Sequence, residues 1–510
     1  MQTLLLTNLM LRSIPTANSN TSSATTLLQP FHDLLYSVLP ADIISLLPVI
    51  TLIAFALLSI ALGKRVKGIA LGVTAVLVAG FLFIVADFSG PALNSTLIFD
   101  SFTKFFTYLI LIIAFFILVA SNLFIGEKAE YNSLLLFSFA GALLAVASTD
   151  LVVLFVAWEL MSIPTYPLAA LGLRKESIEG AIKYFIFGLT SSLIIAFGIA
   201  ILYGITGSTS LQVISTVLSG TTPIPPLTML LPVSLFIVGF GFKIGVVPFH
   251  MWIPDTYQTA PGTVTTYLSS GTKKVGVATF LRIILVGLLF VRLAWIPLVA
   301  ALSVATMILG NLLAITQTDI ARMLAYSSIA QMGYLFVGIA TSTTWGIAGA
   351  IFYALAHALM NASAFISISL IAYFIRRPVT YAEVAGLGKR APLVAFSFLI
   401  AILSLIGIPS TAGFIGKLVL FSSAIDAGLW WLALIGVLNT VLSLGYYMKL
   451  IKSIYLEEPN DTTSAVKQPR AATSVLVISS ILIIFLGLIP APFLDFAYNA
   501  ARSILPSVWP

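Results

Sequence analysis

Residues 239–250, GFGFKIGVVPFH, place one lysine inside an apolar run, and a proline and a histidine follow it. The rest of the chain is just as apolar: 59% of its 510 residues are hydrophobic, only 8% are charged, and the mean hydropathy is +1.10. Too little polar surface remains to face water, so the composition predicts an integral membrane protein. Lys243 is then a charge inside the membrane, where charges are costly and usually functional.

Apolar runs of about 20 residues recur along almost the whole chain, and each can cross a hydrocarbon core of ~30 Å as a helix. A β-barrel is excluded because its strands would alternate polar and apolar residues over roughly 10 positions. The predicted fold class is an all-α integral membrane protein with about 14 transmembrane helices. Their expected ranges are 43–62, 67–87, 104–124, 132–148, 151–172, 178–205, 228–249, 262–290, 296–316, 320–341, 345–375, 392–424, 429–455 and 472–490.

The formal net charge of +7 comes mostly from lysines and arginines in short loops between these runs. In that position basic residues set the orientation of a membrane protein, so they give no support for nucleic-acid binding. All the basic loops fall on one side of a 14-helix arrangement. This pattern predicts that these loops face the cytoplasm or its equivalent, and that the partner of the exposed surface is the lipid bilayer.

Two runs, the seventh and the twelfth, contain glycine and proline at positions that interrupt a helix: the quoted stretch and GIPSTAGFIGK at 407–417. Irregular backbone at membrane depth is tolerated where it is buried in protein or lines a wet cavity, and paired interruptions are typical of inverted repeats in transporters. Lys243 and Lys417 are 174 residues apart, and so are Lys183 and His357. Each repeat then holds five helices, an odd number, so the second must be inverted relative to the first.

This pattern predicts five parts of the chain. Residues 1–40, which are rich in Ser, Thr and Asn and lack the apolar core of a signal peptide, form an N-terminal lead-in. The other parts are helices 1–3 (41–131), the first five-helix repeat (132–290), the second, inverted repeat (291–456), and a loop, helix 14 and tail (457–510).

Eight ionisable side chains fall inside or at the ends of the predicted spans. Each costs roughly 3 kcal/mol at the bilayer centre unless it is paired or hydrated, so eight of them predict an internal polar line. They are Glu159, Lys183, Lys243, His250, Lys273, Lys274, His357 and Lys417.

The carboxylate and the lysines suggest a proton switch. Separating a Glu159–Lys243 pair would leave a buried ammonium without its counter-charge, and the lysine would then release its proton. The alternative is a static ion pair that joins two helices. Lys243 and Lys417 each lie next to a helix interruption, and the alternative for them is a side chain that reaches the lipid headgroups. The same alternative is stronger for Lys183, which lies near a helix end.

The histidines and the lysine doublet have alternatives of their own. His250 follows Lys243 by two helical turns, so the two side chains share one face of the helix if Pro248 does not rotate the helix between them. An imidazole passes a proton through either nitrogen, although an isolated buried histidine is as often a packing residue. Lys273 and Lys274 point about 100° apart on a helix, so at most one is expected to face an internal axis directly, and Lys273 is the candidate.

The sequence excludes several kinds of cofactor site. There is no cysteine to form a disulfide, attach haem through thioethers, or hold zinc or an iron–sulfur cluster. The three histidines are scattered, with no metal-ligand spacing, and the glycines of GFGFKIG follow no strand, as a dinucleotide-binding loop requires. No cofactor, metal or redox centre is therefore expected in this chain.

Several long motifs resemble a known family. WELMSIPTYPLAAL, KYFIFGLTSS, PFHMWIPDTYQTAP, the stretch 310–338 and GIPSTAGFIGKL are similar to the antiporter-like membrane subunits of respiratory complex I, the type I NADH dehydrogenase, and in particular to its N-type subunit. The resemblance covers roughly residues 40–490. By motif, the family's glutamate of the fifth helix matches Glu159, and its lysines of the sixth, seventh, eighth and twelfth helices match Lys183, Lys243, Lys273 and Lys417. The N-type histidine matches His250.

The resemblance implies 14 helices with two inverted repeats, and a subunit that translocates protons while other subunits transfer electrons from NAD(P)H or a related donor to quinone. Flavin, iron–sulfur clusters and quinone would then lie in partner subunits, and the other membrane-arm subunits would be the direct partners. The expected location is a bacterial or archaeal plasma membrane, or a thylakoid. The alternative function is a subunit of a multi-subunit Na⁺/H⁺ antiporter, which shares the same ancestry.

Overall fold

The computed structural model describes residues 23–63, 68–124, 128–172, 175–220, 225–459 and 466–506. The side chains of 23–27, 226 and 227 are not described, and the basic residues predicted in the loops at 64–67 and at 174 lie outside these ranges. The described chain is almost wholly helical, with one short antiparallel hairpin of β1 (Gly90–Ala92) and β2 (Leu97–Phe99), in which Gly90 pairs with Phe99.

Eleven helices of the described chain are long and apolar enough to cross a membrane, which confirms the predicted fold class. They are α3 (Ala41–Leu62), α4 (Gly68–Ala86), α5 (Ser101–Phe124), α6 (Ala129–Ala147), the pair α7 (Leu151–Ser162) and α8 (Thr165–Ala170), α9 (Lys175–Thr206), α15 (Arg292–Ile315) with the turn before it, α16 (Ile320–Thr341), α17 (Thr344–Ile375), α22 (Trp430–Leu456) and α23 (Arg470–Leu488). Shorter apolar helices accompany them, and the count of 14 crossings stays a prediction.

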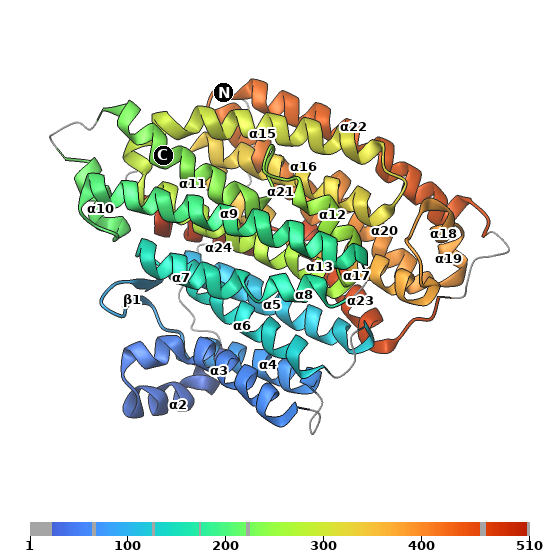
Figure 1. Cartoon of the computed structure of the whole chain (residues 1–510), viewed down its shortest axis with the longest axis horizontal. Coiled ribbons are helices and arrows are strands. Elements are labelled where there is room, and N and C mark those ends of the chain that lie inside the picture. The colour runs from blue at the N-terminus through green and yellow to red at the C-terminus, as the bar shows by residue number, and fades with distance from the viewer. Residues whose placement is uncertain are drawn as a thin grey trace.

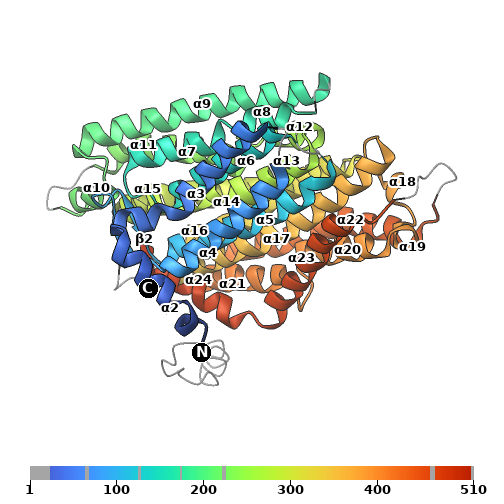
Figure 2. The ribbon, with the colours of Figure 1, turned by 90° about the horizontal axis from the view of Figure 1, so that it is seen from below.

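Most helices lie along the long axis of the molecule, with α18 (Tyr381–Val384) and α19 (Leu387–Arg390) at one end and the hairpin and α10 (Leu211–Leu218) at the other (Figure 1). Figure 2 shows α9 along the outer edge and α16 and α17 in the interior. The outer face of α9 exposes a helical stripe of apolar side chains that suits lipid contact: Ile182, Phe185, Ile186, Leu189, Leu193 and Phe197.

The two predicted interruptions are present. Helix α11 (Pro226–Ile244) ends at Gly245, whose φ is +82°, and α12 begins only at Trp252 and ends at Thr259. Helix α20 (Pro392–Ile406) ends at Gly407, whose φ is +93°, before α21 (Ala412–Asp426). A glycine adopts this left-handed conformation without steric cost, so it ends each half-helix.

The interruptions have a different spacing from the lysines that predicted them. Gly245 and Gly407 are 162 residues apart (407 − 245), whereas Lys243 and Lys417 are 174 apart. Lys243 lies two residues before its interruption and Lys417 ten residues after its own. The 174-residue spacing therefore does not align the two helix breaks.

The predicted helix at 262–290 is continuous from 262 to 287, but it is not a regular α-helix. The segment forms α13 (Gly262–Tyr267), a π-helical turn (Leu268–Thr272), α14 (Lys273–Arg282), a second π-helical turn (Ile283–Gly287) and a 3₁₀ turn (Leu289–Val291). Each π-helical turn widens the helix by about one residue and rotates the side chains beyond it, which a constant 3.6-residue period does not predict.

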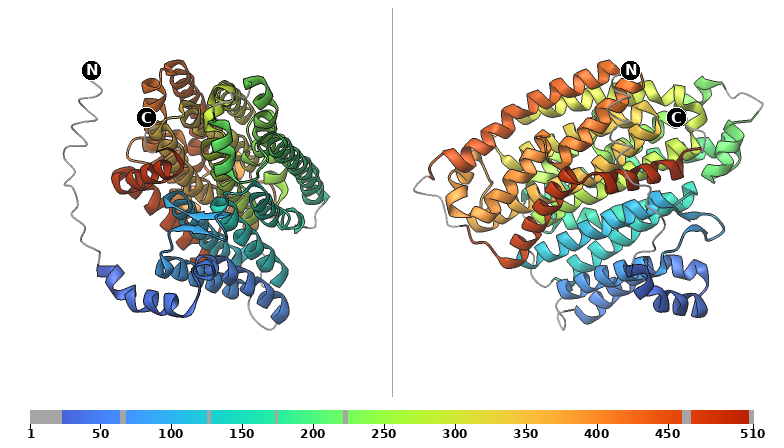
Figure 3. Two further views of the ribbon diagram at one scale, coloured as in Figure 1. Left: turned by 90° about the vertical axis from the view of Figure 1, so that its left-hand side faces the viewer. Right: turned by 180° about the vertical axis from the view of Figure 1, so that it is seen from behind.

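Two terminal helices lie outside the predicted spans. Helix α2 (Ser23–Val38) falls inside the predicted lead-in and packs on α4 through the rings of Phe31 and Phe81 and a 3.2 Å hydrogen bond from the Tyr36 hydroxyl to the Ala86 carbonyl. Figure 3 shows this blue helix at the margin of the bundle. Helix α24 (Ala491–Ile504) follows α23 and packs against α5 and α17.

Candidate functional site

Lys243 is 2% exposed in the last turn of α11, where the helix dipole favours a cation. Its Nζ donates a 2.6 Å hydrogen bond to the Tyr184 hydroxyl of α9 and lies 5.0 Å from the centre of that ring. The ring of Tyr166 lies 5.9 Å away, and the Tyr184 hydroxyl also bonds Thr165 at 2.7 Å. Two aromatic faces and one hydroxyl therefore replace water around the ammonium.

Glu159, on α7, is half-buried and accepts a short hydrogen bond from the Ser192 hydroxyl of α9. It forms no ion pair with Lys243 within the 4.0 Å limit that defines the ion pairs of the described residues. The predicted direct pair is therefore absent, and Tyr184 takes the position next to the ammonium.

Lys273 and Lys274 are both fully buried and both have polar partners. Lys273 Nζ donates to the Ser328 hydroxyl of α16 at 2.8 Å, and Lys274 Nζ lies 2.7 Å from Nδ1 of His357 on α17. The structure buries both side chains, and the expectation that at most one of them faces an internal axis directly stays a prediction. Helix α14 is packed against α5, α6, α11 and α17, so directions 100° apart both lead into the protein.

Two glycines bring α11 and α14 close together between Lys243 and Lys273. A Cβ atom at Gly276 would lie 3.1 Å from Ile244 and 3.8 Å from the Cβ of Lys243. A Cβ atom at Gly245 would lie 3.4 Å from Nζ of Lys273. The two lysines thus occupy facing elements whose backbones approach because side chains are absent between them.

His357 connects the lysine doublet to the twelfth predicted span. Its ring stacks on that of Tyr353, one turn earlier in α17, with the centres 6.3 Å apart and the planes 19° from parallel. The Tyr353 hydroxyl donates a short hydrogen bond to Oε1 of Gln331 on α16, and Nε2 of Gln331 donates to the Leu405 carbonyl at 3.0 Å. That carbonyl belongs to the last turn of α20, at the helix interruption.

Lys417 completes this connection. Its Nζ donates to the carbonyls of Leu405 at 2.9 Å and Ile406 at 3.0 Å and lies 4.5 Å from the centre of the Tyr334 ring. These carbonyls lack helical partners because α20 stops at Gly407, so the interruption supplies the acceptors for the ammonium. Contacts therefore run from Lys274 to Lys417 through the interior, and they are hydrogen bonds except for the ring stack between His357 and Tyr353, where Nε2 of His357 has no hydrogen-bond partner among the described atoms.

Lys183 and His250 lie apart from the lysine contacts described above. The Lys183 side chain is 43% exposed and forms ion pairs with Glu179 and Asp255, each at 2.9 Å. His250 is half-buried, and its Nδ1 has no hydrogen-bond partner among the described atoms. The two-turn spacing from Lys243 does not place His250 on the same face, because α11 ends at Ile244 and the backbone turns before His250.

Sequence reasoning missed several polar residues of the site. Tyr184, Tyr353 and Gln331 are neutral, and in an apolar span they have no pattern that separates them from core residues. Arg282 had a clear signal, since it is an arginine inside the predicted span 262–290. It is 1% exposed and binds both carboxylate oxygens of Asp100, at 2.8 and 3.0 Å.

The Asp100–Arg282 pair gives a pH dependence. Asp100 precedes α5, and burial alone would raise the pKa of its carboxyl, but the Arg282 guanidinium and the Thr103 hydrogen bonds hold this pKa below its ordinary value of 3.8. A carboxyl with a lowered pKa stabilises the fold at higher pH and loses this contribution as the pH falls through the folded-state pKa. At pH values below about 4, we expect the unfolding temperature of the purified protein to decrease. The Asp100→Asn protein should lack this part of the decrease. An equal decrease in the unmodified and the Asp100→Asn proteins would contradict the role given to the Asp100–Arg282 pair.

A bundle of membrane-spanning helices with a buried line of lysines and a histidine is the architecture of an ion- or proton-translocating membrane protein. Among the described residues no group of three or more His, Cys, Asp or Glu side chains could hold a metal. The chain belongs to the transmembrane family described as NADH:quinone oxidoreductase/Mrp antiporter, whose sequence profile matches residues 148–443.

Individual relatives agree with this membership. The chain is 39% identical to F(420)H(2) dehydrogenase subunit N of Methanosarcina mazei over 81% of this chain and 86% of the relative. It is 35% identical to NADH-quinone oxidoreductase subunit N of Trichlorobacter lovleyi, over 92% and 97% of the two chains. A chain of respiratory complex I from Thermus thermophilus with bound aureothin superposes with a TM-score of 0.77 at 28% identity, covering 89% of this chain and all of that one.

Proposed function

We propose that this chain is a proton-translocating membrane-arm subunit of a complex I-type quinone oxidoreductase in an energy-transducing membrane. Electron transfer would take place in partner subunits that hold flavin, iron–sulfur clusters and quinone, and this chain would move protons. The observation that carries the proposal is the buried series of contacts from Lys274 to Lys417, which joins two lysines through hydrogen bonds and one ring stack between His357 and Tyr353. The names of the N-subunit relatives support the kind of complex.

Within this function we assign proton carriage to the lysines and His357. Lys243 and Lys273 lie on facing elements, Lys274 contacts His357, and Lys417 ends the line at the α20 interruption. Each lysine alternates between ammonium and amine as a proton arrives and leaves. The neutral partners around them, a tyrosine and a glutamine among them, can donate and accept hydrogen bonds in either state.

The three remaining predicted residues, Glu159, His250 and Lys183, lie beside this line and influence proton transfer along it. Glu159 supplies a negative charge whose distance from Lys243 sets how firmly that lysine holds its proton. His250, whose Nδ1 has no hydrogen-bond partner among the described atoms, can exchange a proton with this line through water. Lys183 binds Asp255, which also pairs with Arg322 at 2.7 Å. This assigns Lys183 to the basic-loop end of the molecule, at the approach to the line.

The two halves of the line would belong to the two inverted five-helix repeats, 132–290 and 291–456. The equivalent hydrogen bonding at the two helix interruptions supports this assignment to two repeats. The amides of Gly245 and Val246 both donate to the Gly241 carbonyl, and those of Gly407 and Ile408 both donate to the Leu403 carbonyl. Each repeat would then contribute one broken helix to the line.

Replacing Lys243 with methionine tests the function. We expect the purified complex, reconstituted into liposomes, to lose most of its proton translocation per electron, because methionine fills the same volume without a titratable group. The control is Lys452→Met, which removes a lysine that is 66% exposed at the end of α22. A Lys243→Met complex that translocates protons as the unmodified complex does would overturn the proposal.

Co-purification separates the proposed function from the Na⁺/H⁺ antiporter. A preparation in mild detergent should carry flavin and iron–sulfur absorbance from partner subunits if the chain belongs to an oxidoreductase. A complex that retains all its membrane subunits, shows neither absorbance and exchanges Na⁺ for protons in liposomes would establish the antiporter instead.

A further inference from the structure

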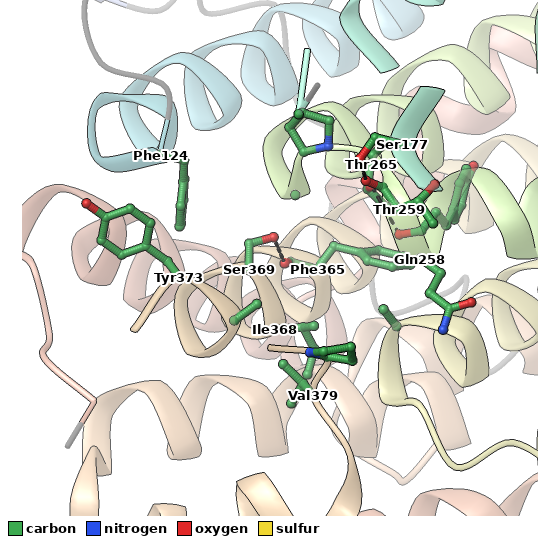
Figure 4. A pocket seen from close by; sticks show the side chains of 18 of the residues that line it. Phe124, Ser177, Gln258, Thr259, Thr265, Phe365, Ile368, Ser369, Tyr373 and Val379 are labelled. Atoms are coloured by element: carbon green, nitrogen blue, oxygen red, sulfur yellow. Dashed lines mark hydrogen bonds between the residues drawn. The ribbon is translucent and has the colours of Figure 1, made fainter. Parts of the chain in front are cut away.

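A cavity of about 390 Å³ lies at the end of the molecule that carries the basic loops. The exposed residues Lys128, Gln258 and Arg376 line its outer part, and the buried residues Tyr257 and Phe365 line its inner part. Figure 4 shows Phe365, Ile368 and Ser369 of α17 on one side of the cavity and Ser177, Thr259 and Thr265 on the other. The volume is enough for several water molecules, and the lining offers hydroxyls and carbonyls to bind them.

Tyr257, in α12, forms the boundary between this cavity and the buried lysines. The side chain is 2% exposed, and its ring packs edge-on against Phe365 with the ring centres 5.6 Å apart. Nζ of Lys273 lies 5.3 Å from the centre of the same ring. One residue therefore lines the cavity and contacts a lysine of the candidate site.

The Tyr257 hydroxyl has no hydrogen-bond partner among the described atoms, although it is fully buried. A buried hydroxyl without a hydrogen-bond partner destabilises the fold, so such a group calls for a partner such as water. Other buried tyrosines nearby are satisfied: the Tyr267 hydroxyl bonds Ser138 at 2.7 Å, and the Tyr131 hydroxyl bonds Thr263 at 2.8 Å. Tyr257 lines the cavity and its ring contacts Lys273, so water held in the cavity would supply the partner that this hydroxyl lacks.

We propose that Tyr257 passes protons between water in this cavity and Lys273, which makes the cavity the inlet of the proton line at the basic-loop end. The inference rests on the proposed function and assigns a further residue to it. In one transfer the phenolic oxygen takes a proton from a hydronium ion of the cavity and gives its own proton, directly or through one water, to the neutral amine of Lys273. Two O–H bonds break, one in the hydronium ion and one in the phenol, while a new phenolic O–H bond and an N–H bond on Lys273 form; the hydronium becomes water, the tyrosine stays neutral, and the lysine gains one positive charge.

The test is Tyr257→Phe, which keeps the ring, its packing on Phe365 and its contact with Lys273 and removes only the hydroxyl. In the reconstituted complex we expect proton translocation per electron to fall about tenfold or more, since a positioned proton-transfer group typically contributes roughly 10²–10⁴-fold and water replaces it in part. Tyr267→Phe is the matched control, because it removes a buried phenol hydroxyl from α13 that neither lines the cavity nor contacts Lys273. This control should keep proton translocation within about twofold.

Lys273→Met, measured alongside, separates the inference from the function on which it rests. If Lys273→Met stops proton translocation and Tyr257→Phe does not slow it, the Tyr257 role is wrong and the proposed function stands. If neither variant slows it, the assignment of Lys273 to the line fails as well. A loss in Tyr267→Phe equal to that in Tyr257→Phe would show a general packing effect and would also overturn the inference.

Discussion

Replacing Arg282 with leucine is expected to lower the free energy of unfolding by about 3–5 kcal/mol, the usual loss when one partner of a buried ion pair is removed. The Arg282 side chain is 2% exposed and that of Asp100 is 11% exposed. The guanidinium also donates to the Thr103 hydroxyl at 2.7 Å and covers the Phe102 ring. Without it, a carboxylate stays buried with no counter-charge, and α14 loses its link to the start of α5.

Thermal unfolding of the purified protein in detergent measures this loss. The matched control is Lys389→Leu, which breaks the Lys389–Glu458 pair, whose side chains are 72% and 77% exposed; exposed pairs contribute about 1 kcal/mol or less. Adding Asp100→Asn to Arg282→Leu should restore much of the stability, because no unpaired charge then remains. An Arg282→Leu protein as stable as the Lys389→Leu control would contradict this account.

Replacing Gly413 with alanine is expected to disable the line at Lys417. A Cβ atom there would lie 1.8 Å from the Ser404 carbonyl oxygen and 2.8 Å from the carbonyl carbon, so α20 and α21 must move apart. Overpacking of this kind costs about 1–3 kcal/mol. The shift also separates Nζ of Lys417 from the Leu405 and Ile406 carbonyls, and each such bond to a charged group contributes about 1.5–3 kcal/mol.

We expect Gly413→Ala to lose most of its proton translocation per electron and to unfold at a lower temperature. Gly445→Ala on α22 is the control, because a Cβ atom there meets nothing within 4 Å and alanine favours a helix. If the two alanine variants translocate protons equally well, the close contact at Gly413 does not position Lys417.

The sequence was sufficient to predict the membrane class and most of the buried charges, because an ionisable residue is conspicuous in an apolar run. Lys243, Lys273, His357 and Lys417 were predicted as buried, and the structure buries all four. The two interruptions were predictable as well, since glycine and proline act on the backbone locally.

The rest depends on which elements meet in space. Lys183 lies in the same kind of apolar run as Lys243, but its face of α9 meets Asp255 near an end of the bundle, so its side chain is half-exposed. The π-helical turn at Leu268–Thr272 sets the direction of the lysine doublet, and no residue in it marks a change of helix period. Tyr353 and Gln331 join the line only because α16 and α17 pack side by side.

The two half-helices that stop inside the membrane have an electrical consequence for the lysines. Lys243 is in the last turn of α11, and Nζ of Lys417 binds the final carbonyls of α20, so both ammonium groups lie at the negative pole of a helix dipole. Such a pole stabilises a cation by about 0.3–2 kcal/mol. The negative pole of a helix, unlike a carboxylate, cannot lose its charge by taking up a proton. Lys243 and Lys417 therefore each have a permanent but weak counter-charge. The repulsion from one positive charge that arrives along the line is strong enough to outweigh this counter-charge.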